Sequence, residues 1–172
     1  MGPGLGLRRA TTADAGVAQP LIERFFAEEG FHAPPGGVRR QLLGLLSDDE
    51  CAVFLAWQGD EAVGVATVTT TSGIELGLSA EMEDLYVLPA ARGLGVGAAL
   101  VEMVKDWCRS RGCSLVSVVV TPEGQAAHDL VGYYRRRGFV ETGRTILFAP
   151  LQAGEGYGAG RQAEGMNTGA EH

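Results

Sequence analysis

The spacing of apolar and polar positions changes several times along the chain, and each change predicts a new element. Residues 5–9 predict a short first strand, and residues 11–14 have the spacing of a helix capping box. Apolar residues then recur every fourth position between residues 17 and 25, which predicts a helix that Pro20 either kinks or delays. A second, shorter helix is predicted around residues 42–46.

The centre of the chain has the composition of strands. Residues 51–57 and the Val- and Thr-rich residues 62–71 flank a polar turn, so together they predict an antiparallel hairpin. Residues 81–88 predict the next strand, which Pro89 stops.

The clearest helix covers residues 95–111. Apolar residues fall on one of its faces, at Val96, Leu100, Val104 and Trp107. Gly112 follows, where helices commonly end. The β-branched residues 115–120 predict a strand buried on both faces, residues 125–137 predict a further helix, and residues 146–151 predict a last strand.

Elements in this order predict an α/β (α+β) fold, with a mixed sheet that carries helices on both faces. A chain of 172 residues has room for one domain, which we place at residues 5–151. Residues 1–4 and the glycine-rich residues 152–172 hold too little apolar surface to order themselves, so we expect both segments to be disordered.

Composition and charge narrow the function classes. The formal net charge of -7 disfavours nucleic acid and favours cationic partners. No apolar run approaches the roughly 18 residues that span a membrane, and no secretory leader pattern is present, so we expect a soluble, cytoplasmic protein. The cysteines, Cys51, Cys108 and Cys113, lack paired spacing and nearby histidines, which favours core positions over disulfides or a metal site.

The most informative segment is the turn between the strand at residues 81–88 and the long helix. It contains Arg92 and three spaced glycines, Gly93, Gly95 and Gly97. Glycines let backbone N–H groups approach a ligand without an intervening Cβ. The first N–H groups of a helix also lack internal partners and carry partial positive charge, so phosphate oxygens suit this site.

Two other interpretations of this turn compete with phosphate binding in a coenzyme site. One is a purely structural glycine turn. The other is dinucleotide binding, because Gly93, Gly95 and Ala98 fit G-x-G-x-x-G/A. The dinucleotide motif normally opens its fold, however, and here the turn comes mid-chain with no room for a second nucleotide-binding half.

The spacing of Arg92, Gly95 and Gly97 resembles the R/Q-x-x-G-x-G/A signature of the GNAT superfamily of acetyltransferases. Residues 83–87 look like the strand that precedes this signature in the family, and residues 133–139 look like its late Y-x-x-x-G-F segment. The resemblance covers about residues 5–151. It implies a mostly antiparallel sheet whose central strands splay apart, with acetyl-CoA bound as cosubstrate in the opening and no metal.

The resemblance also implies which residues contact the cofactor. Pantetheine amides would pair with the edge of the central strand at Leu85, Tyr86 and Val87. The pyrophosphate would lie on the turn, at Arg92, Gly93, Leu94, Gly95, Val96, Gly97 and Ala98. Tyr134 stands where the family's tyrosine protonates the departing thiolate, whereas an aromatic residue on a buried helix face is more often part of the core.

Three carboxylates precede the turn: Glu81, Glu83 and Asp84. Acetyl transfer to a protonated amine first requires a base, which a carboxylate or a water chain can supply. Strict strand alternation places Glu81 and Glu83 on one face and Asp84 on the other unless a bulge intervenes. Binding a cationic acceptor is a second role for the same groups, so the sequence leaves the base undecided among them.

The acceptor is expected to be a small-molecule amine. Acidic residues such as Glu28, Glu29 and Glu50, together with the negative charge, favour a polycation. The pattern is similar to that of aminoglycoside N-acetyltransferases, enzymes of antibiotic resistance. A polyamine or a protein amine fits the same chemistry, and a non-catalytic acetyl-CoA sensor is a further alternative. The sequence does not settle the oligomeric state, so a homodimer remains open.

Overall fold

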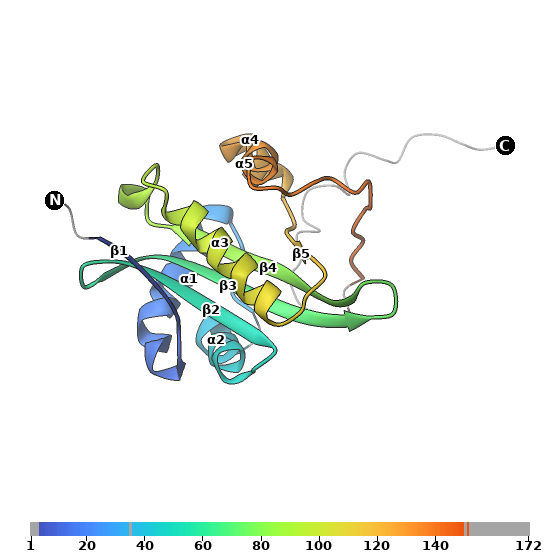
Figure 1. Ribbon diagram of the computed structural model, residues 1–172. Helices are drawn as coiled ribbons and strands as arrows, with labels where there is room; N and C mark the ends of the chain where they lie inside the picture. Colours follow the sequence, from blue (N-terminus) through green and yellow to red (C-terminus); the bar gives the residue numbers. More distant parts are fainter. Residues whose placement is uncertain (1–3, 35, 150, 152–172) are drawn as a thin grey trace.

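The computed structural model describes residues 4–34, 36–149 and 151. In these residues five strands form one sheet in the order β1-β2-β3-β4-β5 (Figure 1). The strands are β1 Leu5–Arg9, β2 Cys51–Gln58, β3 Glu61–Gly73, β4 Gly77–Val87 and β5 Val116–Ser117. The first four pair antiparallel and β5 pairs parallel with β4, which confirms the predicted mixed sheet.

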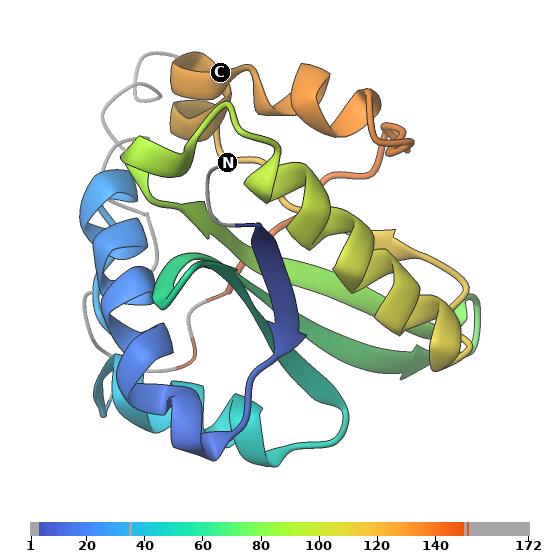
Figure 2. The ribbon, with the colours of Figure 1, turned by 60° about the vertical axis from the view of Figure 1, so that its left-hand side comes forward.

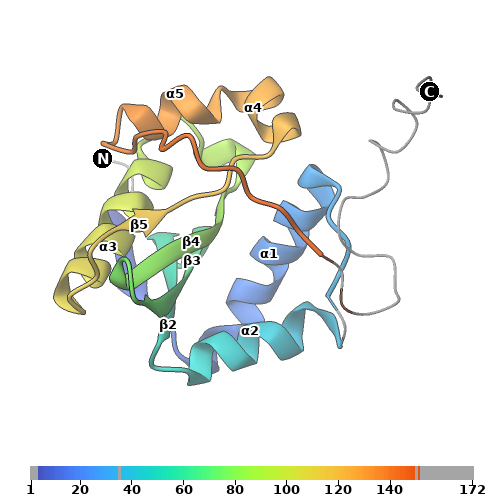
Figure 3. The same cartoon turned by 90° about the vertical axis from the view of Figure 1, so that its right-hand side faces the viewer.

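Helices cover both faces of the sheet, as predicted. They are α1 Ala15–Glu29, α2 Gly37–Ser47, α3 Val96–Ser110, α4 Pro122–His128 and α5 Leu130–Arg135. Helices α1 and α2 lie on one face, and α3 lies on the opposite face (Figure 3). Helix α3 runs obliquely across the strands, and α4 and α5 lie beside its N-terminal end (Figure 2).

The apolar stripe predicted on the long helix forms the centre of the core on its side of the sheet. Val96, Leu100 and Val104 are buried, and Trp107 packs edge-on against Phe54 of β2. The continuous apolar character of β2 and β3 follows from helices packing on both faces of these strands. Cys51 and Cys108 are buried and Cys113 is partly buried, which agrees with their predicted packing role.

Helix α1 accommodates Pro20 within its length instead of starting after it. A short 3-10 turn, Thr12–Asp14, precedes the helix, and the backbone N–H of Thr11 donates to Asp14 Oδ2 at 2.8 Å. Pro20 is the sixth residue of α1, so the carbonyl that loses its partner belongs to the first turns of the helix.

Three predictions for the C-terminal third were wrong. The helix predicted at residues 125–137 is divided into α4 and α5 at Asp129, whose φ of 47° is left-handed. The strand predicted at residues 115–120 is only two residues long in β5. Residues 146–149 and 151, predicted as a last strand, are not in a strand, and residue 150 lies outside the described residues.

The two strand errors have the same reason. A β-branched or apolar run becomes a strand only where a neighbour accepts its hydrogen bonds, so side-chain propensity alone does not decide. Ile146 and Leu147 are exposed, and no strand of the described sheet includes them. The predictions of disorder for residues 1–3 and 152–172 fall outside the described residues.

Candidate active site

A β-bulge in β4 shapes the end of the strand that carries the three predicted carboxylates. Thr67 of β3 pairs with Asp84, but the next residue, Val68, pairs with Met82. Glu83 is therefore the extra residue on β4, with no counterpart on β3. The strand shifts its alternation at this point.

The bulge brings all three carboxylates to the same face of the sheet. Glu81 pairs with Thr69 and Asp84 pairs with Thr67, and these threonines point to one face because they are two residues apart. Glu83 joins them, since Thr69 Oγ1 donates to Glu83 Oε1 at 2.6 Å. The sequence analysis expected Asp84 on the opposite face only in the absence of a bulge, and strict alternation does not continue through the bulge that the structure has.

Asp84 is the most enclosed of the three carboxylates. Thr67, only 1% exposed, donates its hydroxyl hydrogen to Asp84 Oδ2, and its oxygen accepts the Asp84 backbone N–H at 3.1 Å. Burial raises the pKa of Asp84, the Thr67 hydrogen bond opposes this, and the nearby charge of Glu83 adds to it. Asp84 is thus a carboxyl group whose proton affinity is increased toward neutral pH.

Glu81 and Glu83 are exposed and lie beside this buried group. Desolvation, and secondarily the charge of Glu83, raises the pKa of Glu81. Like charges placed close together gain from a cation between them. The arrangement can therefore bind a positive group and accept a proton from it.

The glycine turn begins directly after β4. Residues Pro89–Ala91 form a 3-10 turn, and α3 starts at Val96 with Gly95 as its N-cap. Gly93 and Gly95 have φ values of 76° and 82°, which an L side chain rarely adopts. No atom lies within 4 Å of where their Cβ atoms would be, so the turn is open on that side.

Open space beside a helix N-terminus is what a pyrophosphate requires. The first backbone N–H groups of α3 lack intrahelical partners and lie at the positive end of the helix dipole. Leu94 is exposed at the tip of the turn, whereas Val96 is buried and anchors the turn to the core. The chemistry of this segment therefore fits the predicted phosphate binding by residues 92–98.

The edge of β4 beyond the bulge is not covered by β5 in the described residues. The parallel pairing consists of Ala80 with Val116 and Glu81 with Ser117, and β5 ends there. Strand β4 continues through Leu85, Tyr86 and Val87, which pair with β3 on the other edge. Residues 85–87 of β4 therefore have no β5 partner, which is the strand arrangement that the resemblance implies for an opening that holds pantetheine.

Two adjacent tyrosines of α5 approach this opening in different ways. Tyr134 is 9% exposed and packs edge-on against Tyr133 and Phe139. Burial, with a smaller contribution from Tyr133, raises the pKa of Tyr134, so its phenol stays protonated. Tyr133 is stacked under Arg137, whose guanidinium carbon lies 3.5 Å from the ring centroid.

Tyr133 explains a glycine that the sequence analysis assigned to phosphate binding. A Cβ at Gly97 would lie 2.8 Å from Tyr133 Oη, which is too close for any real contact. Gly97 therefore lets α5 approach the first turn of α3. Its role in the structure is helix packing at the edge of the opening.

Sequence reasoning missed several residues around the site. It did not assign a role to Thr67 or Thr69, and it placed Glu28 only among acidic residues of the acceptor region. Glu28 instead accepts hydrogen bonds from Tyr86 Oη and Arg92 Nη2, each at 2.6 Å. The run of threonines opposite three carboxylates is the signal that could have indicated Thr67 and Thr69.

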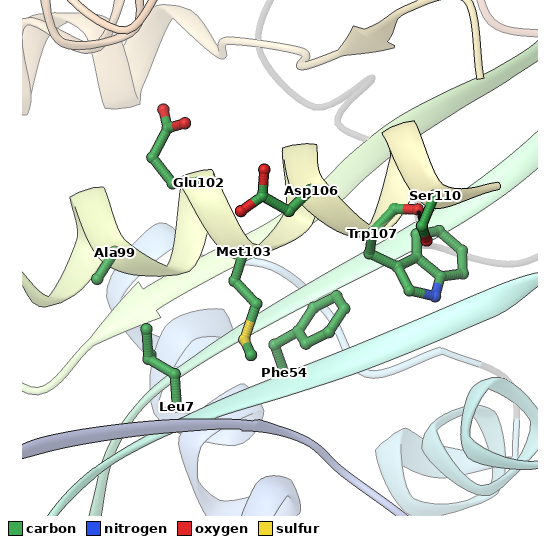
Figure 4. Close-up of a pocket in the computed structure, with 8 residues that line it drawn as sticks. All are labelled: Leu7, Phe54, Ala99, Glu102, Met103, Asp106, Trp107 and Ser110. Carbon is green, nitrogen blue, oxygen red and sulfur yellow. Dashed lines mark hydrogen bonds between the residues drawn. The ribbon is translucent and has the colours of Figure 1, made fainter. Parts of the chain in front are cut away.

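An open cavity lies elsewhere. It has a volume of about 530 Å³ and lies between α3 and the first two strands (Figure 4). Its lining residues are Leu7, Phe54, Ala99, Glu102, Met103, Asp106, Trp107 and Ser110. It contains none of the predicted site residues.

Within the described residues, no group of three or more His, Cys, Asp or Glu side chains is placed to hold a metal ion. No described helix has both the length and the apolarity to cross a membrane.

Comparison with known proteins agrees with this geometry. Residues 19–139 match the acetyltransferase (GNAT) family. An aminoglycoside N(6')-acetyltransferase type 1 from Stenotrophomonas maltophilia is 34% identical over 152 residues, which cover 85% of this chain and 94% of that protein.

Solved structures share the fold. An integron cassette protein from the mobile metagenome of a salt marsh superimposes with a TM-score of 0.74 at 32% identity, covering 85% of this chain and 90% of the other. The aminoglycoside N-acetyltransferase AAC(6')-Iy in complex with CoA gives a TM-score of 0.74 at 21% identity, covering 88% and 98%. The sequence match and the shared fold establish that this chain belongs to the GNAT family of acetyltransferases.

Proposed function

We propose that the chain is an acetyl-CoA-dependent N-acetyltransferase that transfers an acetyl group directly to a primary amine of a cationic small molecule, an aminoglycoside being the first candidate. The observation that carries this proposal is the β4 bulge, which places Asp84 with Glu81 and Glu83 on one face of the sheet. The strand they occupy leads directly into the open glycine turn.

The cofactor would be held mainly by backbone groups. The turn from Arg92 to Ala98 would bind the pyrophosphate through its N–H groups, and the uncovered edge of β4 at Leu85, Tyr86 and Val87 would pair with the pantetheine amides. Acetyl-CoA, when bound there, supplies an activated acetyl thioester. The open space beside Gly93 and Gly95 supports this placement, since side chains would fill it.

Asp84 is the residue we assign as the base. An amine that enters as an ammonium ion must lose a proton before its nitrogen can form a bond to the acetyl carbon. Burial raises the pKa of Asp84, which strengthens it as a proton acceptor. Glu81 and Glu83 are exposed beside it and would attract the cationic acceptor.

Tyr134 is the residue we assign as the general acid. As the carbon–sulfur bond breaks, the departing thiolate needs a proton, and a buried phenol retains its proton until then. It is adjacent to Tyr133, whose hydroxyl lies near Gly97 in the first turn of α3, and this supports a role beside the glycine turn. Tyr133 contacts the first turn of α3 and would shape the opening without transferring the proton.

Two observations support a cationic amino sugar over other acceptors. The chain has a net charge of -7, and the relative from Stenotrophomonas maltophilia is named as an aminoglycoside N(6')-acetyltransferase. Polyamines and protein amines are also cationic, so an assay of the acceptor has to include them.

The test is release of the coenzyme A thiol from acetyl-CoA with aminoglycosides, polyamines, amino acids and peptides as acceptors. We expect strong turnover with an aminoglycoside and weak turnover with the others. Turnover only with peptides or polyamines would keep the chemistry and overturn the acceptor. Tight binding of acetyl-CoA without turnover by any amine would favour a sensor. Absence of binding would overturn the assignment of the turn.

A further inference from the structure

The end of helix α1 carries two carboxylates where the helix dipole disfavours them. Glu28 and Glu29 are the last residues of α1, Gly30 caps the helix in the left-handed conformation, and the last turn contains no basic residue. Negative charge at a helix C-terminus is unfavourable, because the free carbonyl groups there are already partially negative. An acid at this position needs a compensating partner outside the helix.

Glu28 has two such partners, one for each carboxylate oxygen. Tyr86 Oη donates to Oε1 at 2.6 Å, and Arg92 Nη2 donates to Oε2 at 2.6 Å. These hydrogen bonds, first that of Tyr86 and then that of Arg92, lower the pKa of Glu28, so it is ionised at neutral pH. Each carboxylate oxygen therefore accepts a hydrogen bond from a residue of β4 or of the glycine turn.

The two partners belong to the cofactor side of the molecule. Tyr86 lies near the end of β4, and Arg92 is the first residue of the glycine turn. Arg92 is also tied to the end of β4, since its Nε donates to the Val87 carbonyl at 2.9 Å and its guanidinium carbon lies 5.5 Å from the centre of the Tyr86 ring. Glu28 thus closes a network that fixes the start of the turn against the strand.

Helix α1 packs on the face of the sheet that carries the three carboxylates. Phe25, one helical turn before Glu28, has its ring centre 6.1 Å from that of Tyr86. Tyr86 lies two residues beyond Asp84 on β4, so both side chains point to this face. The acceptor side and the cofactor turn therefore meet at Glu28.

We propose that Glu28 is a positioning residue for the cofactor, which acts by holding the Arg92 guanidinium and the Tyr86 phenol together so that the glycine turn is preorganised to receive a pyrophosphate. The inference rests on the proposed function. Preorganisation lowers the cost of ordering a loop on binding, so its loss weakens binding more than it slows the chemical step.

The test measures coenzyme A binding by isothermal titration calorimetry with the full chain, and steady-state kinetics beside it. Glu28→Gln keeps the size of the side chain but removes its charge and one acceptor oxygen. We expect it to raise the Kd for coenzyme A and the KM for acetyl-CoA about fivefold to tenfold, with kcat at saturation changed less than about twofold. Glu23→Gln is the matched control, since it removes the same charge from an exposed position of α1, where Glu23 Oε1 accepts a hydrogen bond from Gln19 Nε2 at 2.7 Å.

A double-mutant cycle shows whether Glu28 acts through Arg92. In an Arg92→Met background, Glu28→Gln should raise the Kd for coenzyme A by less than about twofold, because the Arg92 guanidinium that Glu28 holds is already absent. Equal losses in both backgrounds, or a Glu28→Gln variant that binds coenzyme A like the wild type, would overturn the inference and leave the proposed function intact. A wild-type chain that does not bind coenzyme A would overturn both. Thermal unfolding of each variant separates weakened binding from a loss of the fold.

Discussion

The bulge in β4 and the turn that follows it lie within about a dozen residues of each other but are built in opposite ways. The turn consists largely of backbone, with Gly93 and Gly95 in conformations that leave open space. The bulge instead gathers side chains, and it depends on Thr67 to hold Asp84. One region is disrupted by adding atoms and the other by removing polar atoms, which makes their contributions separable by mutation.

The largest expected effect comes from the bulge. Asp84→Asn removes the proposed base without changing its shape, so we expect kcat/KM to fall about 10²- to 10⁴-fold in the thiol-release assay. Glu81→Gln and Glu83→Gln should mainly raise the KM for the acceptor. If either glutamate variant loses more in kcat than Asp84→Asn, the base has been assigned to the wrong carboxylate.

The Asp84→Asn variant also shows whether Asp84 contributes to activity or to the stability of the fold. Burial raises the folded-state pKa of Asp84 above its unfolded value, so its contribution to stability is present below the unfolded pKa and is lost as pH rises through the folded pKa. The charged form of Asp84 is therefore less favourable in the folded protein than in the unfolded chain. Asp84→Asn should therefore have a Tm at pH 7 equal to or above that of the wild type, measured by thermal unfolding. A clear fall in Tm would mean that Asp84 is primarily structural.

The next effect comes from α5. Tyr134→Phe keeps the buried ring but removes the proton donor, and we expect kcat to fall about 10- to 100-fold while the Kd for coenzyme A is unchanged. Tyr133→Phe is the comparison, since it removes the neighbouring hydroxyl at the edge of the opening. A larger loss of kcat in Tyr133→Phe would transfer the role of proton donor to Tyr133.

The turn should respond to an added methyl group with a smaller effect. Gly97→Ala places a Cβ 2.8 Å from Tyr133 Oη, and the ring cannot move freely because Arg137 is stacked on it. Overpacking of this kind costs about 1–3 kcal/mol in the packed conformation of α3 against α5. Because this packing lies at the edge of the turn, we expect the KM for acetyl-CoA to rise about tenfold. Tyr133→Phe in the same chain removes the clashing oxygen and should restore most of the affinity. If the double variant is no better than Gly97→Ala, the contact with Tyr133 is not the reason for glycine at this position.

The two regions also differ in how far the sequence predicts them. The glycines of the turn, the Arg at its start and the amphipathic α3 are local features, so the turn and its helix were predicted almost to the residue. The hairpin of β2 and β3 was predicted for the same reason, since alternation and a polar turn are contained within one short segment.

The bulge depends on a partner strand that is 17 residues away in sequence, and its shift of register at Glu83 has no local sign. Glu28 is 64 residues from Arg92, so its role needs the folded chain. The shortness of β5 likewise depends on which neighbours are present. Local patterns therefore predicted the fold class and the glycine turn. The placement of the three carboxylates on one face could be seen only in the tertiary structure.

The smallest expected effect is the most specific test of the bulge. Thr67→Val keeps the buried shape but removes the hydroxyl that bonds to Asp84, and that hydrogen bond lowers the pKa of Asp84. Without it the pKa rises further, so the acidic limb of the kcat/KM–pH profile should move to higher pH. We expect a loss of about two- to fivefold near neutral pH that grows as the pH falls and disappears at alkaline pH, where Asp84 is ionised in both proteins. Thr69→Val, whose hydroxyl bonds to the exposed Glu83, should leave the profile in place. A loss in Thr67→Val that is the same at every pH would show that the hydroxyl orients Asp84 without tuning its proton affinity.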